Sequence, residues 1–223
     1  MVIKVFKKVA LITLVGVGIL YFTHPIFIGK KHLQQLGLEA TAQDFISAEI
    51  LLGKSFIKPS EDPNKQLLQS GANPVEVTFS EMQFSAHISA MHPVGEVTSV
   101  FTQNNFEVSG IFERSRISGF KKTLGITSLK SIPLFFIAEK FLLTDPSFYF
   151  KGQGSVYDNK VSILIKEARI GMVPISNKMA SNLLEDYFEL VLEKAPAFNA
   201  NEITLQKDFL LFYGTATAVV PIY

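Results

Sequence analysis

The chain has 223 residues, with 21 Lys and Arg, 20 Asp and Glu and a net charge of +1, so it lacks the basic footprint of a nucleic-acid-binding protein. It contains no Cys, which excludes disulfides, thiolate metal sites and Cys nucleophiles. Hydrophobic residues make up 48% of the chain, and all but three of its 20 Phe residues follow Gly29. This surplus of Phe predicts either a large aromatic core or an apolar groove or interface.

The first predicted element is the uncharged apolar stretch Val9–Gly29, which three lysines precede and Lys30 and Lys31 follow. Twenty-one helical residues span about 31 Å, close to the hydrocarbon thickness of a bilayer. The segment Tyr21–Phe27 offers bulky residues where a signal peptidase needs small ones, which favours an uncleaved anchor over a cleaved signal peptide. We therefore predict a single-pass transmembrane anchor over residues 1–31 in the cell membrane. The lysine balance favours a cytoplasmic N-terminus and an extracytoplasmic C-terminal domain.

Residues 32–74 are predicted to form a helix followed by a linker. Apolar residues recur at mixed helical spacings over residues 33–54, and Thr41 is a candidate cap. Residues 58–74 are rich in Pro, Gly, Asn and Ser, which is typical of turns and loops.

The segment from Val75 to residue 113 is predicted to hold a strand, a helix and a hairpin. Val75–Phe79 alternates as a strand does, and Ser80 with Gln83 forms a capping box that opens a helix ending before Pro93. The strands Glu96–Thr102 and Phe106–Glu113 form a hairpin around Asn104-Asn105.

Two histidines, His87 and His92, lie five residues apart in this part of the chain. This spacing does not place them on one helical face, so we expect two ordinary polar residues rather than a metal site.

The middle of the chain combines a basic segment and an apolar one. Arg114–Gly125 is predicted to be a loop, either solvated or in contact with anionic lipid headgroups. Ile132–Leu143 is too short to span a bilayer, and Pro133 suits the first turn of a helix. Its apolar residues surround most of that helix, which predicts burial, dipping into the membrane or lining of a groove.

The last third is predicted to form a hairpin, a long helix and a second hairpin. Ser147–Tyr157 and Lys160–Ala168 pair around Asp158-Asn159, and Gly152 and Gly154 inside the first strand indicate a strongly curved sheet. Residues 177–193 form a helix whose buried side is predicted to carry Met179, Leu183, Leu184, Tyr187, Leu190 and Val191. The closing hairpin consists of Glu202–Gln206 and Phe209–Val220.

The order helix, strand, strand occurs twice, over residues 80–113 and 177–217. Val77–Phe84, Phe106–Gly110 and Val161–Ser176 resemble the corresponding segments of single-pass bacterial membrane proteins related to the tubular lipid-binding (TULIP) superfamily. The resemblance implies an α+β fold over residues 75–223, in which a curved antiparallel sheet wraps around long helices. It also implies an apolar groove that holds acyl chains, and it supplies no catalytic residues.

We therefore predict a membrane-anchored lipid-binding or lipid-transfer module whose partner is membrane lipid. The groove walls are predicted to come from Phe135, Phe148, Phe150, Ile163, Leu183 and Tyr187. The alternative is a non-enzymatic interaction protein whose partner belongs to a cell-envelope assembly. An enzyme is not expected, because the carboxylates are scattered and no nucleophile–base pair has a telling spacing. The sequence predicts no metal and no cofactor.

Overall fold

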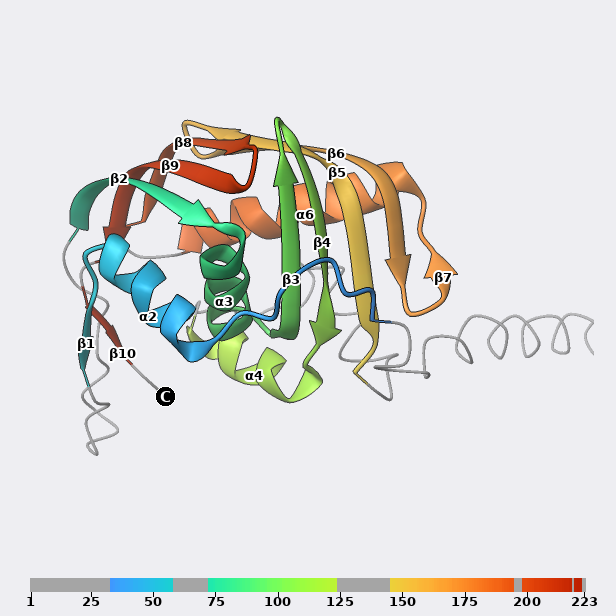
Figure 1. Cartoon of the computed structure of the whole chain (residues 1–223), viewed down its shortest axis with the longest axis horizontal. Coiled ribbons are helices and arrows are strands. Elements are labelled where there is room, and N and C mark those ends of the chain that lie inside the picture. The colour runs from blue at the N-terminus through green and yellow to red at the C-terminus, as the bar shows by residue number, and fades with distance from the viewer. Residues whose placement is uncertain (1–32, 58–71, 124–144, 195–197, 218, 222–223) are drawn as a thin grey trace, which may run out of the picture.

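The computed structural model describes residues 33–57, 72–123, 145–194, 198–217 and 219–221. Within these ranges the fold is α+β, with a curled antiparallel half-barrel sheet and four helices, as Figure 1 shows. The elements in chain order are α2 (Ala42–Leu51), β1 (Ser55–Ile57), β2 (Ala72–Ser80), α3 (Glu81–Met91), β3 (Val94–Thr102), β4 (Asn105–Phe112), α4 (Arg114–Thr123), β5 (Ser147–Tyr157), β6 (Lys160–Ile170), β7 (Val173–Pro174), α6 (Asn177–Lys194), β8 (Asn199–Gln206), β9 (Phe209–Thr217) and β10 (Val219–Pro221).

Strand β5 joins the two parts of the sheet. Along most of its length it lies between β4 and β6, and β3 continues the sheet beyond β4. At the end of β5, Val156 and Tyr157 pair with β8, which leads on to β9 and β2. Strand pairing confirms the three predicted hairpins, and Asn104, Asp158, Asn159 and Asp208 at their turns all have positive φ. The first turn consists of Gln103 and Asn104, one residue earlier than predicted.

The curvature of the sheet depends on two glycines at close backbone approaches. A Cβ atom on Gly152 would lie 2.5 Å from the carbonyl oxygen of Leu164, at the point where the register between β5 and β6 shifts. On Gly214 in β9 it would lie 2.0 Å from the carbonyl oxygen of Asn199, beside the register shift in β8. Both positions therefore require glycine. For Gly152 this agrees with the sequence analysis, which took a glycine inside the strand as a sign of a curved sheet.

Helix α3 satisfies polar groups along β3 with side chains spaced four residues apart. These side chains lie on one face of the helix, and their partners lie at every second residue of the strand. The three contacts are Glu81 Oε1 with the N–H of Phe101 (2.5 Å), Ser85 Oγ with Ser99 Oγ (2.8 Å) and Ser89 Oγ with the N–H of Val97 (3.3 Å).

Helix α6 makes a similar set of contacts along β6, but its strand partners are not evenly spaced, because Lys166 is the extra residue at the register shift between β5 and β6. Again the helix side chains are spaced four residues apart and run antiparallel to the strand. The three bonds are Asn177 Nδ2 to the carbonyl of Lys166 (2.9 Å), the N–H of Ile165 to Ser181 Oγ (2.9 Å) and the N–H of Ile163 to Glu185 Oε1 (2.7 Å). Four helical residues rise about 6.0 Å and two strand residues about 6.6 Å, which matches both steps of the contacts along β3 and the step from Ile165 to Ile163 along β6. We call the two sets of contacts the α3 ladder and the α6 ladder.

The predicted helix over residues 33–54 is only partly correct. Helix α2 begins at Ala42, and Thr41 forms a capping box with Asp44. Residues 33–41, which we call the N-terminal strap, have no regular structure and cross the sheet on the side opposite α6 in Figure 1. The strap is held where Leu36 donates its N–H to Thr98 Oγ1 (3.4 Å) and where Arg169 Nη2 donates to Gln34 Oε1 (2.7 Å).

The predicted loop over Arg114–Gly125 is wrong, because α4 occupies Arg114–Thr123. The capping box of Ser80 and Gln83 and the helix over residues 177–193 are confirmed to within a residue. Val9–Gly29, residues 58–71 of the predicted linker and Ile132–Leu143 lie outside the described residues. The predicted linker is wrong for its last three residues, 72–74, because β2 begins at Ala72. In the part that is described, none of the helices has the length and hydropathy needed to cross a bilayer.

Replacing Ser181 with Ala tests the α6 ladder. Ser181→Ala leaves the N–H of buried Ile165 without its partner, which we expect to lower the free energy of unfolding by about 1–3 kcal/mol. Urea denaturation followed by circular dichroism measures this change. Ser118→Ala, an exposed serine of α4, is the matched control and should change stability by less than about 0.5 kcal/mol. Equal effects in the two variants would contradict a role for the ladder.

Candidate lipid-binding site

Four of the predicted lipid-contacting residues lie together between the sheet and α6. Phe148, Phe150 and Leu183 are buried in one apolar cluster, and Ile163 packs against it. Phe148 and Phe150 come from β5, Ile163 from β6 and Leu183 from α6, so the cluster joins three elements. The ring of Phe148 lies between those of Phe150 and Phe112, tilted against both, with centroids 5.6 and 4.8 Å away. The cluster is closely packed in this structure.

Tyr187 lies one helical turn beyond Leu183 and belongs to a neighbouring cluster. It is buried with Ile117 of α4, and Phe120 and Phe188 pack against the pair. Burial raises the pKa of Tyr187 well above its ordinary value, so the phenol keeps its proton. Phe135, the sixth predicted residue, lies outside the described residues.

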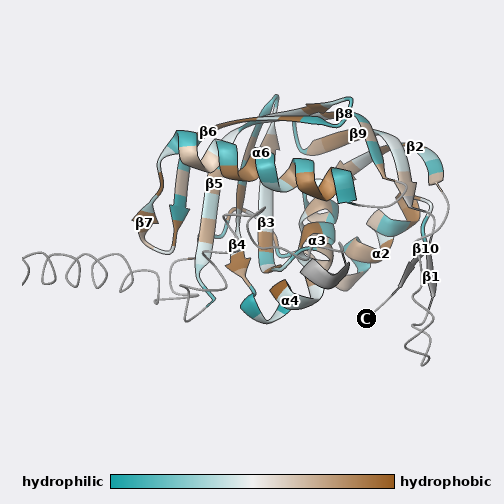
Figure 2. Ribbon diagram, turned by 180° about the vertical axis from the view of Figure 1, so that it is seen from behind, coloured by the Kyte–Doolittle hydropathy of each residue, from teal (hydrophilic) through white to brown (hydrophobic). Residues whose placement is uncertain are grey.

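Met179 was expected on the buried side of α6, and this expectation is wrong because 47% of its surface is exposed. The inward face begins at Ala180 and continues through Leu183 and Tyr187. Ser181, also buried, accepts the hydrogen bond from the N–H of Ile165 in the α6 ladder. Figure 2 shows α6 crossing in front of the strands, with hydrophobic and hydrophilic residues mixed along the helix. A hydrophobic residue near the start of a helix thus did not mark the face that packs.

His92 connects the end of α3 to α6. Its Nδ1 atom shares a hydrogen bond with the hydroxyl of Tyr187, and its ring lies 5.6 Å from that of Phe120. Burial, followed by the positive charges of His87, Arg116 and Lys54, lowers the pKa of His92 to about 3. His92 is therefore neutral at physiological pH.

His87 connects the middle of α3 to α2. Its Nδ1 atom lies 2.5 Å from Oε1 of Glu49, whose side chain is fully buried, and Lys54 Nζ lies 2.8 Å from Oε2. Burial raises the pKa of Glu49, but the hydrogen bond and charge of His87 and the ion pair with Lys54 outweigh it, so the net shift is downward. The two histidines have separate partners, and among the described residues no group of three His, Asp or Glu side chains could hold a metal ion.

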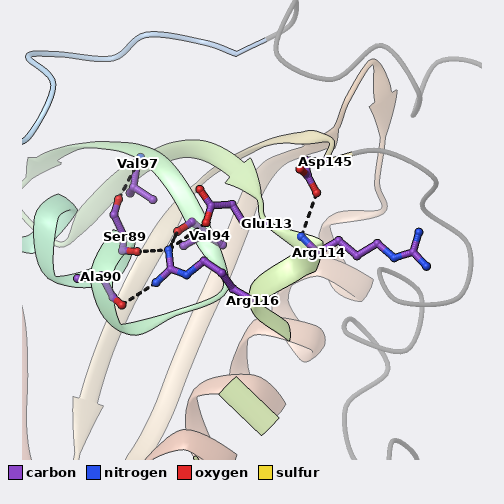
Figure 3. A network of polar contacts seen from close by, with 8 residues as sticks. All are labelled: Ser89, Ala90, Val94, Val97, Glu113, Arg114, Arg116 and Asp145. Atoms are coloured by element: carbon purple, nitrogen blue, oxygen red, sulfur yellow. Dashed lines mark hydrogen bonds and ion pairs between the residues drawn. The ribbon is translucent and has the colours of Figure 1, made fainter. Parts of the chain in front are cut away.

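Arg116 of α4 binds the C-terminal end of α3, as Figure 3 shows. Its Nη1 atom donates to the carbonyls of Ser89 (2.5 Å) and Val94 (2.8 Å), and Nη2 donates to the carbonyl of Ala90 (2.6 Å). The last turn of α3 contains no basic residue of its own, so Arg116 supplies the positive charge that this end of the helix dipole favours. Sequence reasoning missed this role because it treated Arg116 as part of a basic loop.

A cavity of about 490 Å³ lies elsewhere, where the β3–β4 and β8–β9 turns meet. Its lining consists of Gln103, Asn104, Thr204, Leu205, Gln206, Lys207 and Phe209. None of the predicted lipid-contacting residues belongs to it, so it does not form part of the candidate site.

Comparison with protein-family models, with curated proteins and with solved structures finds no match to this chain.

Removing the Arg116 side chain should loosen α4 from α3. Arg116→Ala leaves three carbonyl groups without their donor, and we expect a loss of about 2 kcal/mol in the free energy of unfolding. Arg114→Ala is the matched control, since the Arg114 guanidinium points away from the end of α3 in Figure 3. Chemical denaturation of both variants makes the comparison. A loss as large in Arg114→Ala would argue against the assigned role.

The low pKa of His92 predicts a loss of stability in mild acid. Between pH 6.5 and about 3 the unfolded chain binds a proton at this position that the folded protein does not. Stability should therefore fall as the pH drops from about 6 to 4, by up to about 1.4 kcal/mol per pH unit from this group. His92→Gln, which does not titrate, should have a flatter profile in urea denaturation across this range. Parallel profiles would contradict the prediction.

Proposed function

We propose that this chain is a single-pass, membrane-anchored lipid-binding module with an extracytoplasmic domain, and that acyl chains bind between α6 and the sheet. The observation that carries the proposal is the gathering of Phe148, Phe150, Ile163 and Leu183 in one apolar cluster that α6 covers. Burial of an acyl chain there would contribute about 0.8 kcal/mol for each CH₂ group removed from water. Binding of this kind needs no catalytic group, so the proposed module is not an enzyme.

Entry of a lipid requires α6 to separate from β6, and the α6 ladder makes this separation feasible. The backbone hydrogen bonds of a helix are internal to it, and β6 keeps its pairing with β5 when the helix moves. The three side-chain bonds of the ladder, the His92–Tyr187 hydrogen bond and the apolar contacts of Ala180 and Leu183 must open. The acyl chain then takes the place of the helix against the phenylalanines.

The alternative is an interaction module of a cell-envelope assembly, and a surface feature of α2 favours it. Ile46 and Ile50 are one turn apart on α2 and are both exposed, the second of them to 64%. An exposed pair of apolar side chains on a helix is more favourably buried against a protein partner than left in contact with water. The close packing of Phe148 and Leu183 also agrees with a domain whose core is complete without a ligand.

A photoreactive lipid tests the proposed function. The full chain is reconstituted into liposomes that contain a phospholipid with an acyl-chain diazirine, irradiated, and mapped by peptide mass spectrometry. We expect adducts on β5 and α6. Leu183→Phe should raise their yield by up to about fivefold, because about 1 kcal/mol of overpacking strains the closed packing that the lipid displaces. Met179→Phe, one turn away and exposed, should leave the yield unchanged.

Circular dichroism checks that both variants remain folded. Adducts confined to residues 1–32 would exclude a lipid site in the domain. Crosslinking in cells that captures a protein, and is lost in Ile50→Glu but not in Leu183→Phe, would favour the alternative.

A further inference from the structure

We infer that the turn between β6 and β7, residues 170–173, faces the phospholipid headgroups and is the membrane-contacting surface of the domain. The inference rests on the membrane anchor of the proposed function and goes on to identify the part of the domain that the anchor holds against the bilayer. It follows from three observations: the short reach of the chain after the anchor, the point where the N-terminal strap is held, and the exposed side chain beside that point.

The chain between the predicted anchor and the strap is short. Five Cα–Cα steps lead from Gly29, the last residue of the apolar stretch, to Gln34. Fully extended, they span at most about 18 Å, and the headgroup layer itself takes up about 5–8 Å of that distance. Gln34 therefore lies within about 13 Å of the outer surface of the headgroups. Any group fixed beside Gln34 is close to the membrane as well.

Arg169 of β6 is the group that fixes Gln34. Its Nη2 atom donates to Gln34 Oε1 (2.7 Å) and lies 3.3 Å from Glu167 Oε1. Its guanidinium carbon lies 4.8 Å from the ring centroid of Tyr149, which holds the group against the sheet by a cation–π contact. Arg169 pairs with Pro174 of β7, so the β6–β7 turn follows within three residues.

The turn presents an apolar side chain to solvent. Met172 is 53% exposed, while Ile170 and Val173 on either side are half-buried. Gly171, at φ 57°, donates its N–H to the carbonyl of Ser147 (2.7 Å), so the turn is fixed to β5. Figure 2 shows a hydrophobic strip at β7. A flexible thioether fits the irregular boundary between headgroups and acyl chains.

The exposed residues of α2 lie at the other end of the domain. The strap runs from the β6 side to α2, and Figure 1 places α2 and β7 at opposite ends of the long axis. Ile50 is more exposed than Met172 and more apolar, but it is reached only after the whole strap has crossed the sheet. It provides a matched control for an exposed apolar residue that the anchor does not hold near lipid.

The absence of Cys from the chain allows a direct test with single labels. Met172→Cys and Ile50→Cys are made in the full chain and labelled with an environment-sensitive fluorophore. The labelled chains are reconstituted into phosphatidylcholine vesicles with a minor share of phosphatidylglycerol and a headgroup-attached quencher lipid. We expect a blue shift and at least about twofold stronger quenching at position 172 than at position 50. Equal quenching, or stronger quenching at position 50, would overturn the inference.

Two further measurements separate the possible failures. Flotation of the labelled chain with the vesicles tests the anchor alone: a chain that does not float overturns both the anchor and this inference. A chain that floats without quenching at position 172 overturns this inference and leaves the lipid site of the proposed function standing. A flexible insert of 12 Gly and Ser residues after His32 adds about 20 Å of reach and should abolish the quenching at position 172. Undiminished quenching would contradict positioning by the anchor.

Discussion

The edge of a β-strand leaves backbone N–H groups without partners, and the arrangement of this domain depends on how β3 and β6 meet that requirement. Two helices meet it with polar side chains at every fourth position, centred on buried Ser85 and Ser181. Neither helix can slide or rotate without leaving strand groups unpaired. The ladders therefore set the positions of α3 and α6 against the sheet more sharply than apolar contacts could, since those have no preferred direction.

Helix α3 is consequently the element to which the other three described helices are attached. Glu49 of α2 reaches it through His87, Arg116 of α4 binds its C-terminal carbonyls, and Tyr187 of α6 pairs with His92. All three contacts are polar and lie at least partly inside the protein, where an unpaired group is costly. The proposed lipid site lies beside these contacts. Movement of α6 would break the His92–Tyr187 bond and the α6 ladder, and burial of an acyl chain would have to offset that loss of free energy.

Local signals predicted much of this fold. The turns at Asn104 and at Asp158-Asn159 follow from residues that tolerate positive φ, and the Ser80 capping box marks the start of α3. Contacts between distant residues could not be predicted. Nothing near Arg116 in the sequence indicates that its partners are the carbonyls of another helix, and Gly119 and the basic residues around it suggested a loop where α4 forms. In the candidate site, the spacing of apolar residues correctly predicted that Leu183 and Phe148 face the same cluster. It wrongly placed Met179 on the buried side of α6, because Met179 fits the helical spacing although the first turn of the helix is exposed.

The pairing of β2 with β9 has a consequence for biogenesis. Ala72 pairs with Thr217, so the two strands are separated by almost the whole of the described domain. A chain synthesised from its N-terminus can assemble α3 with β3 and β4 early, because those contacts span few residues. The edge of β2 that receives β9 has no partner until the last hairpin emerges. An extracytoplasmic domain would thus cross the membrane before its sheet can close, and during that interval β2 offers an open template for pairing with other chains.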